Sequence, residues 1–324
     1  MAIKSRHRFV EHTPFLEPVA MRLLLAYDSS SHAERAADFL HKIPFRRPVD
    51  LDLVSVVTPP IMVDAGGFGM PVDLSTFLGE ETEQTRTAID AAAASLREQL
   101  PVRAIHTHIP VGPAATEILS VAEDTKSDLI VLGALGHSAM QRVLLGSVSD
   151  YVATHADTST LIVRPHAQAN VELELQKIVI ALSGQPEDAR MLRWLRAWKL
   201  RPHVEVHLVR VMPLHTFFRQ DIRQRASGYW DEQMEFARKQ ILEFETQVQA
   251  SDLSSETHLI EADHIGEALI EYADQHGCDL IMTGDSDSGL LTRVFLGSTS
   301  RYVVRHAHCS VLIARNDAEM TIDK

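Results

Sequence analysis

The segment LGALGHS at residues 132–138, followed by LGSVS at residues 145–149, combines three glycines with hydroxyl side chains. It follows the apolar run DLIVL at 128–132, which predicts a buried strand, and its second part begins a predicted helix at 147–155. Glycines in such a turn let the backbone approach a ligand, and the free N–H groups of a helix start attract anions. The segment therefore predicts a phosphate-binding loop.

The same pattern returns near the C-terminus. The tripeptide at 128–130 matches the one at 279–281, and RVLLGS at 142–147 matches RVFLGS at 293–298 with the same separation. Two copies of one unit explain this agreement, and 324 residues suffice for two domains. We expect an N-terminal extension at 1–20, a first domain at 21–165, a linker at 166–176, a second domain at 177–316 and a tail at 317–324.

Strands and helices alternate in both copies. In the first, the pattern predicts strands at 22–27, 51–57, 102–109, 128–132 and 160–163, with helices at 32–43, 80–100, 114–124 and 147–155. In the second, it predicts strands at 177–182, 204–212, 258–261, 279–283 and 310–314, with helices at 188–200, 231–248, 266–276 and 298–306. Alternation favours parallel pairing with helices on both faces, hence an α/β fold of two tandem doubly wound five-stranded parallel sheets. In the common strand order 3-2-1-4-5, Asp28 at the end of the first strand lies beside Gly133.

Composition excludes several classes of function. The formal net charge of -13 disfavours nucleic acid as a partner, because binding it depends on Lys and Arg at the phosphates. No apolar run reaches the roughly 18 residues of a membrane span, and residues 1–11 lack the apolar core of a signal peptide. Two cysteines are too few for a disulfide framework. We expect a cytoplasmic protein without a membrane partner.

The spacing Gly133-x2-Gly136-x9-Gly146-Ser147 resembles the ATP-binding signature of the universal stress protein family. The resemblance covers 22–165 well and 177–315 with losses. It implies a tandem member of that family, with an adenine nucleotide alpha hydrolase-like fold and two halves related by a pseudo-two-fold axis. It also implies ATP, with Mg²⁺, as the ligand.

The resemblance assigns roles to individual residues. The family's aspartate and valine at the adenine correspond to Asp28 and the backbone of Val56, although Asp28 also suits an N-cap of the first helix. The other implied ligand contacts are Leu132 at the pocket wall, Gly133 and Gly136 at ribose and phosphate, Gly146, Ser147 and Val148 at the phosphates, and Ser149 at the second hydroxyl position of the signature.

The second copy departs from the signature at two positions. Ser183 replaces the aspartate and Asp287 replaces the second glycine, and both changes oppose nucleotide binding. We therefore expect ATP in the first domain only, although Gly297 and Ser298 leave an anion or a Mg²⁺-bridged ligand open. The second copy then has an architectural role, in which residues 160–163 and 310–314 pair as an internal pseudo-dimer; a further homodimer stays open.

Other signals receive weaker interpretations. His106 with His108, and His203 with His207, could bind Zn²⁺ if a third ligand arrives, but polar outward faces are favoured and no metal site is assigned. His137 lies within the loop, where solvent is favoured over a γ-phosphate. Residues 217–219 and Trp230 favour core packing over a partner surface.

No catalytic residues are assigned, since no Gly-x-Ser-x-Gly motif occurs. The resemblance implies a nucleotide-dependent regulator or sensor in stress response, with an unknown protein partner. A slow ATPase and an interaction scaffold without nucleotide are the alternatives.

Overall fold

The computed structural model describes residues 21–60, 74–135, 145–165, 175–214, 220–285 and 296–315. The first repeat comprises β1 to β5 and α1 to α4. Its strands are β1 Met21–Ala26, β2 Val49–Val54, β3 Val102–His108, β4 Leu129–Gly133 and β5 Ser159–Val163. Its helices are α1 Ser31–His41, α2 Leu74–Gln99, α3 Ala114–Thr125 and α4 Ser147–His155.

The second repeat follows the same order of elements. Its strands are β6 Lys177–Ala181, β7 Glu205–Pro213, β8 Ser254–Ala262, β9 Leu280–Gly284 and β10 Ser310–Ala314. Its helices are α5 Asp188–Ala197, α6 Gln220–Gln249, α7 Ile265–His276 and α8 Ser298–His306. The expected α/β architecture with tandem doubly wound halves is confirmed.

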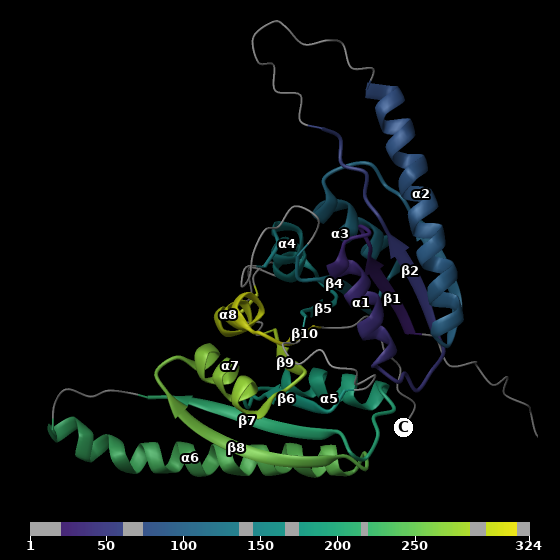
Figure 1. Ribbon diagram of the computed structural model, residues 1–324. Helices are drawn as coiled ribbons and strands as arrows, with labels where there is room; N and C mark the ends of the chain where they lie inside the picture. Colours follow the sequence, from purple (N-terminus) through teal and green to yellow (C-terminus); the bar gives the residue numbers. More distant parts are fainter. Residues whose placement is uncertain are drawn as a thin grey trace, which may run out of the picture.

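All these strands form one ten-stranded sheet, in the order β3-β2-β1-β4-β5-β10-β9-β6-β7-β8 (Figure 1). Each half therefore has the expected order 3-2-1-4-5. The strands β4, β5 and β10 at the middle of the sheet are buried at every position, as expected for strands covered by helices on both faces.

Two helix layers cover the sheet. Successive residues of a strand point to opposite faces, so Leu23 and Leu25 join one hydrophobic cluster while Leu24 joins the other. The first cluster receives α1, α2, α5 and α6, and the second receives α3, α4, α7 and α8. The layers continue from one repeat into the other.

The two halves meet through β5 and β10, which pair antiparallel with Leu161 opposite Leu312. This pairing confirms the expected contact between residues 160–163 and 310–314, and it merges the two predicted sheets into one. Reciprocal bonds follow the pseudo-two-fold relation. The Arg164 amide donates to Ser310 Oγ at 3.3 Å, and the Arg315 amide donates to Ser159 Oγ at 3.0 Å.

The structure corrects three predicted boundaries. α2 and α6 begin earlier than the expected residues 80 and 231, and β8 is longer than the expected 258–261. Within the part of the chain that the structure describes, β8 is an edge strand that pairs with β7 alone, so its first half is polar and lacks an apolar run that would predict a strand. Trp230 is half-buried in α6, and residues 217–219 lie outside the described residues.

Candidate functional site

The carboxyl ends of β1 and β4 form the switch point of the first repeat. β1 pairs with β2 on one side and with β4 on the other. The connections that follow β1 and β4 therefore run in opposite directions along the sheet. Open α/β sheets bind ligands at such a crevice. Asp28 follows β1 by two residues and Gly133 ends β4. The structure therefore brings these two predicted residues to the same edge.

Asp28 is exposed and supports the start of α1. Its Oδ1 accepts the amide of Ser30 at 3.0 Å, while Ser30 Oγ accepts the amide of Ala33 at 3.2 Å. The N-cap of α1 is thus Ser30 and not Asp28. The exposed carboxylate at the switch point suits the predicted contact with a ligand.

The close packing of α1 against the end of β4 requires a glycine at position 133. A Cβ at this position would lie 2.6 Å from the backbone oxygen of His32, in the first turn of α1. The absent side chain lets α1 approach the end of β4. The matching Gly284 has more room, because its Cβ would meet Glu187 Cβ only at 3.8 Å.

The start of α4 is held next to this strand end. Gly146 donates its amide to the Ala134 carbonyl at 2.8 Å, and buried Ser149 donates its hydroxyl to the Gly133 carbonyl at 2.7 Å. Ser300 makes the same 2.7 Å bond to Gly284. This hydroxyl therefore positions the helix in both repeats, a role of Ser149 that the sequence signature does not reveal.

The N-terminus of α4 has the features of an anion site. Its N-cap, Gly146, makes no side-chain cap bond, and Ser147 is exposed while Val148 is half-buried. The first amides of such a helix have no intrahelical partner and lie at the positive end of its dipole. An anionic group at the switch point would satisfy them.

Two apolar positions border the same edge. Leu132 is buried and Val56 is half-buried, and both belong to the hydrophobic cluster beneath α3 and α4. The amides of Ser55 and Val57 donate to the carbonyls of His108 and Pro110, so the Val56 backbone faces the other way, towards β1. Gly136 and His137 lie outside the described residues.

The second repeat has a cavity of about 330 Å³ at the equivalent edge, lined by residues of β6, β7, β9 and the start of α8. Three carboxylates line it, those of Glu187, Asp188 and Asp285. Asp285 stands where the first repeat has Ala134, which the sequence alignment of the copies already places there. Asp287, the residue predicted to oppose nucleotide binding, lies outside the described residues.

Hydrogen bonds engage two of these carboxylates. Asp188 accepts from the Ser183 amide at 3.1 Å, the Ser183 hydroxyl at 2.8 Å and the Gly184 amide at 2.8 Å. Burial raises the pKa of Asp188 although these bonds oppose the shift. Asp285 accepts from Arg315 Nε at 2.9 Å. Ser183 thus belongs to a polar network that the first repeat does not share, since Ala33 stands five residues after Asp28.

The universal stress protein family model matches residues 20–164 and 174–315. The chain therefore belongs to the universal stress protein family, as a tandem member. A universal stress protein of Mycobacterium tuberculosis is 24% identical over 308 residues, covering 92% of this chain and 98% of that protein. The universal stress protein MJ0531 of Methanocaldococcus jannaschii is 30% identical over 154 residues, 46% of this chain and 84% of its own.

Solved structures agree with this fold. The crystal structure of a universal stress protein from Archaeoglobus fulgidus superposes with a TM-score of 0.59 at 17% identity. The match covers 92% of this chain and 97% of that one. Among the helices of the described residues, none combines the length and apolar character needed to cross a membrane.

Proposed function

We propose that this chain binds ATP, with Mg²⁺, in its first repeat and acts in the cytoplasm as a nucleotide-dependent regulator or sensor in stress response. The observation that carries the proposal is the α4 N-terminus, whose N-cap Gly146 has no side chain to satisfy the first amides, next to the switch point where Asp28 lies. Asp28 and the Val56 backbone would hold the adenine. The α4 amides, with Ser147, would hold the phosphates.

The second repeat is proposed to be architectural. Its cavity has volume for a ligand but three carboxylates in its lining. A carboxylate about 4 Å from a phosphate costs about 4 kcal/mol at an effective dielectric of about 20, which exceeds two decades of affinity. The arginine beside Asp285 reduces this repulsion there, but Glu187 and Asp188 keep the cavity unfavourable to a triphosphate.

The test compares equivalent positions in the two repeats. Asp28→Ala removes the carboxylate proposed to contact the adenine, and we expect ATP affinity to fall at least about 10-fold, since hydrogen bonds to charged groups contribute about 1.5–3 kcal/mol. Ser183→Ala is the matched control and leaves affinity unchanged. Titration calorimetry of the nucleotide-free protein with ATP and Mg²⁺ measures both.

Gly136→Asp gives a second, independent arm, because it introduces into the first repeat the side chain that the second repeat carries at Asp287. We expect it to abolish ATP binding. Wild-type affinity in both Asp28→Ala and Gly136→Asp would refute the assigned site.

A further inference from the structure

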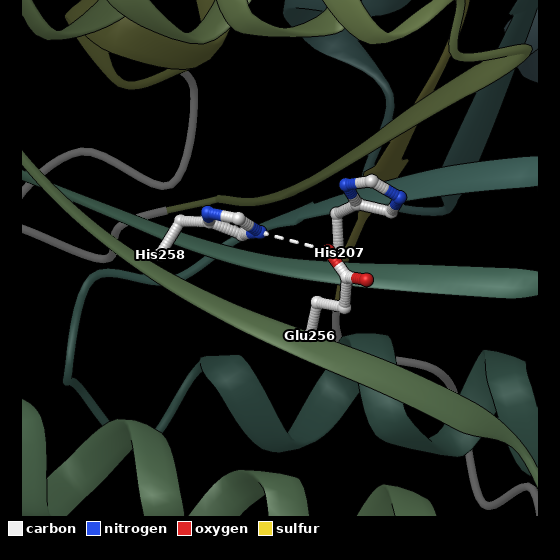
Figure 2. Close-up of side chains that lie close together, drawn as sticks. All are labelled: His207, Glu256 and His258. Carbon is white, nitrogen blue, oxygen red and sulfur yellow. Dashed lines mark ion pairs between the residues drawn. The ribbon is translucent and has the colours of Figure 1, made fainter.

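Two histidines and a glutamate gather on the face of β7 and β8 that α7 covers (Figure 2). His207 pairs in register with Glu256, and His258 lies two residues further along β8 on the same face. The cavity of the second repeat is not lined by His207, Glu256 or His258. The favoured interpretation of His207 as an outward polar residue is wrong, because only 3% of it is exposed.

The three side chains present their donor atoms to a common point. One ligand atom from each of His207, Glu256 and His258 lies within 4.8 Å of the other two. The two imidazole rings are nearly parallel, at an interplanar angle of 13°. His258 Nε2 lies 3.4 Å from Glu256 Oε2, the pair joined by the dashed line in Figure 2. This arrangement matches the donor set of a metal centre.

Among the described residues, no atom forms a hydrogen bond with two buried nitrogens of this cluster, Nε2 of His207 and Nε2 of His258. Glu256 Oε2 approaches His258 Nε2 only as an ion pair, at 3.4 Å. An unsatisfied buried polar atom costs about 1–3 kcal/mol, so each points to a missing ligand. Glu205 Oε2 lies 3.6 Å from His207 Nε2, beyond hydrogen-bond reach, and is paired with Lys177 at 3.0 Å.

The other nitrogen of His207 is held in place. His207 Nδ1 and the hydroxyl of Tyr272, a buried residue of α7, are 2.7 Å apart. Metal-binding histidines almost always use their second nitrogen in such a bond, which orients the ring and fixes its tautomer. Donation from Nδ1–H to Tyr272 leaves the lone pair of Nε2 directed at the cluster.

We propose that His207, Glu256 and His258 form a binding site for a divalent transition metal of the Zn²⁺ type. Two imidazoles and one carboxylate are a recurrent zinc donor set, and the fourth tetrahedral position then takes water or another ligand. Tyr272 acts as the positioning residue for His207.

Metal binding requires only a small closure. Zinc bonds of about 2.0–2.1 Å in tetrahedral geometry separate ligand atoms by roughly 3.3 Å, so the donors approach one another by about 1.5 Å or less. Glu256 and His258 supply this movement, because 68% and 31% of their side chains are exposed. Buried His207 stays fixed as the anchor.

The experiment measures zinc binding to the full chain, without nucleotide, by equilibrium dialysis with metal analysis. His258→Gln and Glu256→Gln each remove a ligand without deleting a buried side chain. His106→Gln, on the exposed part of β3 in the first repeat, is the matched control for zinc on surface histidines. Wild type and His106→Gln are expected to bind one more zinc per chain than His258→Gln.

Tyr272→Phe tests the positioning role and should weaken zinc binding by about 10–100-fold while all three ligands remain. Circular dichroism checks that each variant is folded. The proposal is overturned if folded His258→Gln and Glu256→Gln bind zinc with the same stoichiometry and affinity as the wild type, or if the wild type binds none.

Discussion

Gly133 and Gly284 occupy equivalent positions, yet their surroundings differ. A side chain at Gly133 would collide with the backbone of α1, which cannot move without displacing the helix, whereas Gly284 has ordinary space around it. The sequence pattern predicts only that Gly133 lets the backbone approach a ligand. The contact with His32 adds a packing reason that a signature alone does not reveal, because it depends on where α1 lies relative to β4.

The same substitution should therefore have different effects at the two glycines. Gly133→Ala should lower the free energy of unfolding by about 1–3 kcal/mol through overpacking. Gly284→Ala should be neutral or stabilise by up to about 1 kcal/mol, because alanine restricts the unfolded chain. Urea denaturation of both variants measures the difference. Equal effects would show that the packing around the two glycines is the same.

The interface between the repeats contains two arginine–aspartate pairs at different depths. Arg315, with 4% of its side chain exposed, pairs with Asp285 and donates to the backbone of Ala153 in the other repeat. Arg305, with 43% exposed, pairs with Asp150 across the same interface at 2.7 Å. Burial determines how much each pair matters for stability, because removing one partner leaves a costly uncompensated charge only where water cannot reach it.

Arg315→Met should therefore destabilise the chain by about 3–5 kcal/mol, because it leaves Asp285 and the carbonyls of Ala153 and Thr158 without their donor. Arg305→Met should cost less than about 1 kcal/mol, as for exposed pairs. Chemical denaturation followed by circular dichroism compares them. A cost for Arg315→Met no larger than that for Arg305→Met would contradict the structural role of the buried pair.

Elements with strong local patterns could be predicted from the sequence. The buried runs of β1, β4 and β10 and the glycine at the start of α4 have the expected positions. The beginning of β8 and the His207 cluster could not, because an edge strand has no apolar run and the cluster depends on the register of β7 against β8. Register aligns His207 with Glu256, and no local pattern connects residues so far apart in the chain.

At the scale of the whole molecule, one continuous sheet joins two halves of the same topology but different carboxyl edges. The first repeat offers a helix N-terminus beside Asp28, and the second offers a carboxylate-lined cavity in which Ser183 is bonded to Asp188. The pseudo-two-fold relation preserves the β5–β10 contact and the hydroxyl bonds of Ser149 and Ser300. The architecture is thus symmetric, while the proposed ligand binding is not.

This asymmetry is tested most directly by counting nucleotide. The small molecules released by denaturing freshly purified protein are identified by mass spectrometry, and the nucleotide-free chain is titrated with ATP in Mg²⁺. We expect ATP to be released, and the titration to saturate at one molecule per chain. Two molecules per chain would contradict the assignment of the second repeat as architectural, and absence of binding in both measurements would contradict the ATP site itself.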